Sequence, residues 1–209
     1  MRIVSIFILF LFIGVTSDAQ ETPNAKSDTE DIEPYDYPTK LMGGYNILFK
    51  ADDSTEYLYL VKGTKKIAEL ASDVRGGLYK GLGYVGADFN HCFVFVHSYG
   101  SGNPHEIELI KKSTGKNMLK TSAWWIDVVK EKEVLLYSDQ DVPTAKDHMI
   151  LYNIRTGQKR KFNFPKDIFD EPMILSRIQI NTLTEKVLII EYDTNGYHKT
   201  KKYALNTNQ

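Results

Sequence analysis

Residues Glu108 to Lys116 read ELIKKSTGK, and residues Ile150 to Gln158 read ILYNIRTGQ. Both stretches pass from apolar residues into a Thr-Gly pair, and the second follows the first by 42 positions. At the same distance Phe95 corresponds to Tyr137, each within a separate apolar run. Glycine accepts the positive φ that a tight turn between two strands requires. The sequence therefore predicts two copies of one strand, turn and strand pattern.

The same organisation extends along most of the chain. Short runs rich in Val, Ile, Phe, Tyr and Leu alternate with clusters of Gly, Asn, Asp and Ser, which is typical of strands and turns. We expect four such units, at residues 45–70, 78–121, 124–164 and 175–205. The first unit lacks an obvious inner strand, and the last lacks a clear outer one.

A period of about 40–50 residues with four strands in each unit resembles the blades of a β-propeller. The resemblance is architectural, covers most of residues 45–205, and does not include the WD or kelch signatures. It implies an all-β fold of antiparallel four-stranded units arranged as a propeller-like meander. A β-sandwich or an open barrel is the alternative.

The N-terminus predicts export. Arg2 precedes an apolar run from Ile3 to Val15, and Ser17-Asp18-Ala19 follows. A charged start, an apolar core and small residues at the last and third-last positions are typical of a cleaved signal peptide, here residues 1–19. The apolar run is shorter than the ~20 residues of a spanning helix. We therefore expect a soluble extracytoplasmic protein, periplasmic or secreted, with no membrane insertion.

Residues 20–39 form a second segment, which we expect to be a disordered acidic tether. It holds six acidic residues, one lysine and several prolines, without an apolar period. The remainder, residues 40–209, is expected to be a single all-β domain. Without the leader and the tether, the 26 basic and 27 acidic residues of the chain become 24 and 20. A net charge of +4, spread along the domain, does not favour a nucleic-acid partner.

The single cysteine, Cys92, excludes an intramolecular disulfide. Alternation along its predicted strand places Cys92, Val94 and Val96 on one face, so we expect a buried and unreactive thiol.

Two catalytic motifs are incomplete. Residues 81–86 read GLGYVG, but the dinucleotide fingerprint requires a following helix, and here the chain continues into a predicted strand. We expect instead a glycine-rich strand with a close backbone approach. Ser101 has Tyr99 two positions earlier where the serine-hydrolase elbow needs glycine. No complete catalytic constellation and no cofactor site is therefore predicted.

Histidines and aspartates gather in the predicted loops. His105, His148 and His198 each come just before the third strand of a unit. The same loops also contain four carboxylates: Asp139, Asp141, Asp147 and Asp193. If these loops emerge on one side, the set suits zinc or calcium. A metal-binding protein is therefore one functional alternative.

Aromatic residues favour a binding role. Trp124 and Trp125 are adjacent, so on a strand they point to opposite faces. An exposed tryptophan near loop tyrosines is typical of a protein or saccharide contact. We therefore expect a non-catalytic binding module that recognises a protein or saccharide through a loop face. The candidate partner-binding residues are Tyr99, His105, Trp124, Asp139, Asp141, His148, Asp193 and His198.

A polysaccharide hydrolase is the enzymatic alternative. Its paired carboxylates would come from Asp139, Glu191 and Asp193. Such pairs lie about 5–9.5 Å apart in glycosidases, a separation that only a structure supplies.

Overall fold

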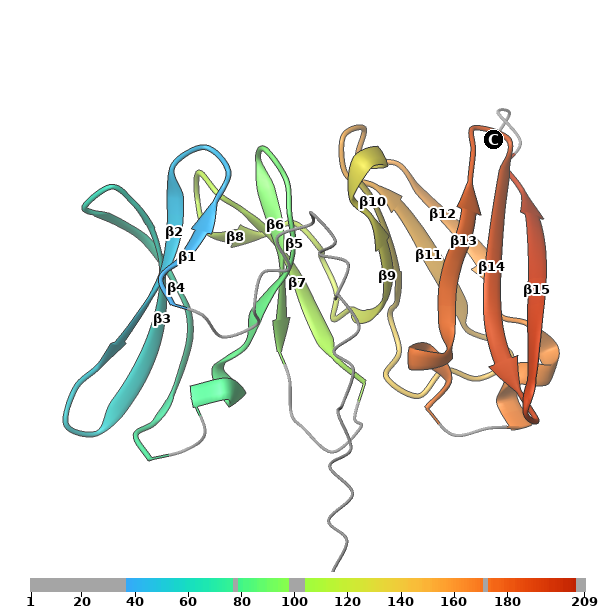
Figure 1. The fold of residues 1–209 in the computed structure, drawn as a ribbon, viewed down its shortest axis with the longest axis horizontal. Helices are drawn as coiled ribbons and strands as arrows, with labels where there is room; N and C mark the ends of the chain where they lie inside the picture. Colours follow the sequence, from blue (N-terminus) through green and yellow to red (C-terminus); the bar gives the residue numbers. More distant parts are fainter. Residues whose placement is uncertain (1–36, 77–78, 98–103, 171–172, 206–209) are drawn as a thin grey trace, which may run out of the picture. The chain divides into compact units, whose positions relative to one another are not determined.

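The computed structural model describes residues 37–76, 79–97, 104–170 and 173–205. The predicted signal peptide, most of the predicted tether, and Tyr99 and Ser101 lie outside these residues. The described chain contains fifteen strands and four short 3-10 helices, and every strand pair is antiparallel (Figure 1). The all-β prediction is confirmed.

The first sheet, sheet A, contains four strands that pair in chain order. They are β1 (Thr39–Leu41), β2 (Tyr45–Ala51), β3 (Thr55–Lys62) and β4 (Lys65–Val74). Strand β1, at one edge of sheet A, lies before the predicted start of the first unit at Tyr45. It begins at Thr39, which the sequence assigned to the tether, and the nearby Tyr37 hydroxyl donates a hydrogen bond to the Gly83 carbonyl (2.7 Å).

Sheet B has eight strands and the order β12-β11-β10-β9-β7-β6-β5, with β8 paired to β7. Its first four strands are β5 (Tyr84–Asp88), β6 (Cys92–His97), β7 (Glu106–Lys111) and β8 (Lys116–Asn117). The other four are β9 (Trp124–Val129), β10 (Val134–Ser138), β11 (His148–Asn153) and β12 (Lys159–Asn163). Each group pairs in chain order, and a single residue pair, Glu106 with Trp124, joins β7 to β9.

Sheet C contains β13 (Ile178–Leu183), β14 (Val187–Thr194) and β15 (Tyr197–Ala204). Within the described residues, sheet C has these three strands, paired in chain order. The 3-10 helices are η1 (Tyr79–Leu82), η2 (Lys130–Lys132), η3 (Lys166–Asp170) and η4 (Ile174–Arg177). Sheets of four, eight and three strands show no closed propeller, and a sandwich or open barrel also fits them. Within the described ranges, no helix has the length and hydropathy for crossing a membrane.

The two Thr-Gly turns have the same structure. Gly115 and Gly157 have φ values of 68° and 75°. The Gly115 amide donates to the Lys111 carbonyl, and the Gly157 amide donates to the Asn153 carbonyl, both at 2.8 Å. A second backbone hydrogen bond also occurs in both groups. The Lys112 amide donates to the His91 carbonyl (3.0 Å), and 42 positions later the Ile154 amide donates to the Glu133 carbonyl (2.8 Å). Both turns join the third strand of a group to its fourth, as the sequence predicted.

Strand β6 is buried on both faces. Phe93 and Phe95 belong to the hydrophobic cluster shared with sheet A, while Cys92, Val94 and Val96 belong to the cluster shared with β9, β10 and β11. Burial raises the pKa of the Cys92 thiol to about 11. The predicted buried, unreactive cysteine is therefore supported, because the thiolate is the reactive form.

A third cluster joins β9, β10 and β11 to sheet C. Its buried members include Leu136 and Met149 from sheet B, and Leu188 and Ile190 from sheet C. The three clusters thus link the groups of strands in chain order.

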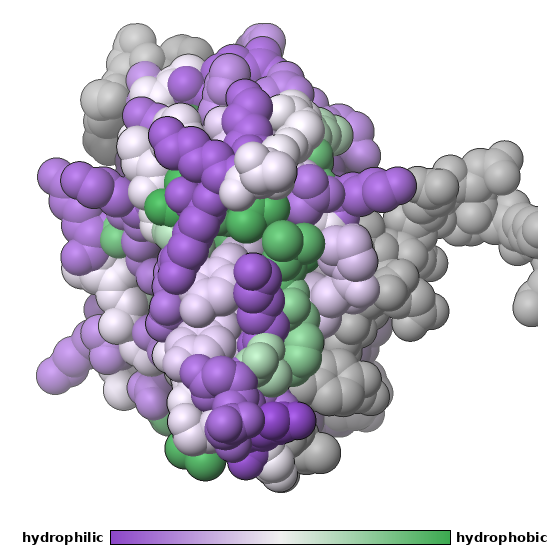
Figure 2. Space-filling view, turned by 90° about the vertical axis from the view of Figure 1, so that its left-hand side faces the viewer, coloured by the Kyte–Doolittle hydropathy of each residue, from purple (hydrophilic) through white to green (hydrophobic). Residues whose placement is uncertain are grey.

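The side of the molecule formed by sheet A is mostly hydrophilic, with a band of hydrophobic residues across it (Figure 2). Tyr57 and Tyr59 stack there with ring centroids 5.5 Å apart, and Lys66 Nζ lies 3.6 Å from the Tyr59 centroid. The lysine covers an aromatic ring that would otherwise be exposed.

Candidate functional site

A cavity of about 580 Å³ lies where strands β5, β9 and β13 approach one another. Each of these strands is the first of a consecutively paired group. The polar and aromatic residues in its wall are Tyr84, His105, Trp125, Asp127, Ser176 and Gln179, and the apolar ones include Ile126, Leu175 and Ile178. A cavity of this size, mostly apolar with a few polar groups, is typical of a small-molecule site.

Glycine lets Trp125 lie against strand β5. A Cβ on Gly86 would stand 2.8 Å from Val96 Cγ2 and 3.1 Å from Trp125 Cζ3, so any side chain there would displace the ring. Gly83 has a φ of 111°, and its Cβ would stand 2.6 Å from the Val96 carbonyl oxygen. The predicted close backbone approach is therefore present at Gly83, but the predicted strand begins only at Tyr84, because Gly81 and Leu82 belong to the 3-10 helix η1. The segment shapes one wall of the cavity.

Tyr84 and His105 form a second wall. The Tyr84 hydroxyl and His105 Nδ1 lie 3.2 Å apart, and the two rings meet edge to face with centroids 6.2 Å apart. Strand β5 holds Tyr84, and His105 stands immediately before β7. The contact fixes both rings and leaves polar edges at the cavity.

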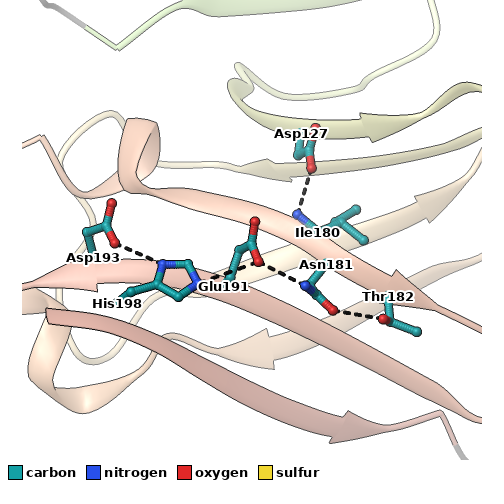
Figure 3. Close-up of polar contacts among 7 residues, drawn as sticks. All are labelled: Asp127, Ile180, Asn181, Thr182, Glu191, Asp193 and His198. Carbon is teal, nitrogen blue, oxygen red and sulfur yellow. Dashed lines mark hydrogen bonds and ion pairs between the residues drawn. The ribbon is translucent and has the colours of Figure 1, made fainter.

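Asp127 ties β9 to β13. Its Oδ2 accepts a hydrogen bond from the Ile180 amide (2.6 Å; Figure 3). Its Oδ1 accepts one from the Val128 amide (2.7 Å). Burial raises the pKa of Asp127 despite these two hydrogen bonds, and the charge of Glu191 adds to the increase. Both oxygens are thus engaged by the backbone, and the carboxylate acts as a rigid bridge beside the cavity.

Trp124, the tryptophan predicted to bind a partner, lies on the opposite face of β9 from Trp125. Trp124 packs against the cluster shared with sheet C, while Trp125 packs against the cluster shared with β6 and lines the cavity. The adjacent tryptophans point to opposite faces, as predicted, but Trp125 and not Trp124 faces the site. Of the predicted residues within the described ranges, His105 lines this cavity.

The β10–β11 connection and the first position of β11 hold three predicted residues. Asp141 Oδ1 accepts a hydrogen bond from the Val142 amide (2.8 Å) and is exposed. Asp139 is partly buried in the same connection, and His148 is the first residue of β11. The neighbouring Asp147 accepts bonds from the Thr144 amide and hydroxyl, both at 2.7 Å, and these lower its pKa. Asp141 and Asp147 therefore shape this connection.

The prediction that a long loop precedes His198 is wrong. A two-residue turn, Asn195-Gly196, joins β14 to β15, and both residues have positive φ (50° and 74°). Asn-Gly is the strongest short hairpin signal, and it sets the register so that Asp193 lies opposite His198. Both residues consequently belong to strands.

The hairpin carries a polar chain on the exposed face of sheet C (Figure 3). His198 Nδ1 lies 3.0 Å from Asp193 Oδ1, and His198 Nε2 lies 3.6 Å from Glu191 Oε2. The Asn181 side-chain amide also donates to Glu191 Oε2 (2.9 Å). The structure therefore brings together Asp193 and His198 from the predicted set, and adds Glu191 from the hydrolase alternative.

The predicted histidines have separate neighbours. His105 contacts Tyr84, while His198 contacts two carboxylates of β14. No group of three His, Cys, Asp or Glu side chains that could hold a metal ion occurs in the described part of the chain.

Sequence reasoning missed most residues of the cavity, including Tyr84, Trp125, Asp127 and Gln179. Because adjacent strand residues point to opposite faces, the sequence showed that Trp124 and Trp125 face away from each other. It contained no signal for which of the two faces borders a cavity. The remaining residues lie on strands far apart in sequence, so no local pattern connects them.

Comparisons of this chain with protein families, curated proteins and solved structures find no match.

Proposed function

We propose that this protein is an exported, non-catalytic binding module that recognises a saccharide through the cavity lined by Trp125, His105 and Gln179. The observation that carries the proposal is the convergence of an aromatic ring and several fixed polar groups on one concave site. Trp125 lies on β9, Gln179 on β13 and His105 directly before β7, so three groups of strands form the site before a ligand arrives. Preorganisation of this kind reduces the entropy lost on binding.

The chemistry of the wall suits a sugar better than a flat protein surface. A sugar ring has an apolar face of C–H groups and a rim of hydroxyls. Trp125 offers an aromatic surface, while His105, Gln179 and Ser176 offer hydrogen-bond donors and acceptors. Protein partners more often use flat patches, whereas small ligands use concave sites.

The four-stranded groups support a blade-like interpretation of the fold. The recurring turns at Gly115 and Gly157 place corresponding strands in corresponding positions. In a blade-like arrangement the first strands lie innermost, and β5, β9 and β13 are the strands that meet at the cavity. A central site between inner strands is where we would place the ligand.

The carboxylates favour binding over hydrolysis. Among the described residues that line the cavity, Asp127 is the one carboxylate, and two backbone amides engage it. Glycosidases require two carboxyl groups, one of them free to donate a proton. This arrangement supports a non-catalytic role.

Tryptophan fluorescence tests the proposal. The chain has two tryptophans, and Trp125 lines the cavity. We would titrate the purified protein with short fragments of neutral glucan, xylan and mannan, and we expect saturable quenching by at least one series. Gln179→Ala, at an exposed position, should weaken that binding by about tenfold, equivalent to ~1.4 kcal/mol.

Trp124→Phe and Trp125→Phe form a matched pair, because they make the same change on opposite faces of β9. The proposal expects weaker binding for Trp125→Phe and unchanged binding for Trp124→Phe, measured by calorimetry. Equal effects of the two changes, or no binding in any series, would overturn it. Release of shorter sugars that Asp127→Asn abolishes would instead establish a hydrolase.

Export requires its own test. Expression of the whole chain in a host with a general secretory pathway should yield an extracytoplasmic product that begins at Gln20. N-terminal sequencing of that product decides the point. Retention of residues 1–19 on a cytoplasmic product would contradict the proposal.

A further inference from the structure

A second cavity, of about 920 Å³, lies between the edge strands β12 and β15, next to η3. We call it the edge crevice, and three of its lining residues are Lys161, Lys166 and Lys201. Aromatic residues also line it, among them Phe162 and Tyr203. The cavity described above shares none of these residues.

The inner face of sheet C is apolar on β14 but largely basic on its edge strand, β15. On β14, Leu188, Ile190 and Tyr192 are buried in the core. Their partners across the ladder on β15 are Tyr203, Lys201 and Lys199, in that order. Paired residues in a sheet point to the same side, so two lysines and a tyrosine occupy the edge of a face that is otherwise apolar.

Strand β12 shows the same change at the edge of sheet B. Met149 and Leu151 on β11 are buried, and their partners on β12 are Phe162 and Arg160. The hydrophobic layer between the two sheets therefore ends in basic and aromatic side chains on both edge strands. On β12, Phe162 and the neighbouring Lys161 line the edge crevice, whereas Arg160 does not. Lysines on edge strands also prevent strand-to-strand aggregation, but that role does not require an aromatic cavity between them.

The aromatic side chains of the edge crevice are fixed. The rings of Phe162 and Tyr203 lie 5.2 Å apart at an angle of 58°, and the Tyr203 hydroxyl donates to the Asn163 carbonyl (2.8 Å). This contact bridges β12 and β15. The ring surfaces are therefore held in place beside the lysines.

The charge of the edge crevice is positive and uncompensated. Asp167 is its one acidic residue among the described ones, and Lys199 Nζ contacts it at 2.6 Å. Within the part of the chain that the structure describes, Lys161, Lys166 and Lys201 form no ion pair with protein carboxylates. Three lysines are thus free to bind an anionic ligand.

From this combination we propose that the edge crevice binds an acidic oligosaccharide, a chain of sugar rings that carry carboxylate groups. The lysines bind the carboxylates, and the aromatic rings contact the apolar faces of the sugars. Nucleic acids fit less well, because their binding depends on many phosphate contacts, and the edge crevice offers three free lysines. The proposal does not rest on the function of the Trp125 cavity.

Calorimetry with the whole protein tests the proposal, with oligogalacturonate as the acidic probe and the uncharged methyl ester of the same oligomer as its control. We expect binding of the acid form that weakens as salt increases, and at least about tenfold weaker binding of the ester. Equal binding of the acid and the ester, or no binding of the acid, would overturn the proposal.

Two lysines of β15 provide matched variants. Lys201 pairs with Ile190 and lines the edge crevice, whereas Lys202 pairs with Ile189 on the opposite face. Both are exposed, so either change to glutamine should leave the fold intact. Lys201→Gln should weaken oligogalacturonate binding several-fold and Lys202→Gln should leave it unchanged. Equal losses of affinity in the two variants would indicate unspecific electrostatic attraction. Tighter binding of polyglutamate than of oligogalacturonate would indicate a site for acidic peptides. Either result overturns the proposal.

Discussion

Lys112 Nζ lies 2.6 Å from Asp88 Oδ1, and the lysine side chain is only 1% exposed. The same Nζ donates to the Met42 carbonyl (2.9 Å), and the Met42 amide donates to Asp88 Oδ2 (2.6 Å). This buried pair therefore connects the β1–β2 turn of sheet A to sheet B. At the position 42 residues later the chain has Ile154, which packs as an apolar residue.

Lys112→Met is expected to destabilise the protein by about 3–5 kcal/mol, because it leaves the Asp88 carboxylate buried without its cation. The free energy of unfolding in urea measures the effect. The double variant Lys112→Met with Asp88→Asn removes both charges and should recover part of the loss. A double variant less stable than Lys112→Met would show that the charge of Asp88 is not the cause.

Tyr137→Phe is expected to stabilise the protein by about 1 kcal/mol. The Tyr137 side chain is fully buried and its hydroxyl has no hydrogen-bond partner in the described structure, which carries a desolvation cost. The corresponding position of the other group already holds phenylalanine, Phe95. Urea unfolding of the two proteins is the measurement. A loss of stability would indicate that the hydroxyl has a partner after all.

Gly115→Ala and Gly157→Ala separate backbone strain from packing. Both glycines have positive φ, but only a Cβ on Gly115 would overlap the Ala68 side chain of β4. We expect Gly157→Ala to cost about 1 kcal/mol and Gly115→Ala to cost about 1–3 kcal/mol more. Thermal unfolding compares them, and Ala68→Gly should relieve the extra cost of Gly115→Ala. Equal costs would contradict the contact with Ala68.

The pH dependence of stability should reveal Asp127. Because burial raises its pKa above the ordinary 3.8, the folded chain holds the proton more tightly than the unfolded chain. Its favourable contribution is present below pH 3.8 and is lost as the pH rises through the raised value. The unfolding free energy of the wild type, relative to Asp127→Asn, should therefore fall across this window. A constant difference would contradict the raised pKa.

Asp167 should show the opposite dependence. Lys199 lowers the pKa of Asp167 below 3.8, and the Tyr192 hydroxyl contributes to the decrease. Its stabilising contribution is present above pH 3.8 and is lost as the pH falls through the lowered value. Relative to Asp167→Asn, the wild type should gain stability with rising pH, by at most about 1 kcal/mol because the pair is partly exposed. Addition of salt should reduce that gain.

Local patterns predicted much of the fold. Strands β7 and β11, which begin at Glu106 and His148, are related by the 42-residue shift seen in the sequence. The burial of Cys92 followed from alternation along β6. The Asn195-Gly196 hairpin was also present as a local signal, and overlooking it misplaced His198. These features depend on neighbouring residues, so the sequence contains them directly.

The sequence by itself determined the strands, their turns and which side chains share a face, because a strand has a period of two and a positive φ favours glycine. Only the tertiary structure decided that Trp125 faces a cavity, that Asp127 bonds to Ile180, and that two basic edges border one crevice. These contacts join residues distant in sequence. They depend on how the sheets pack, and no local pattern encodes that packing.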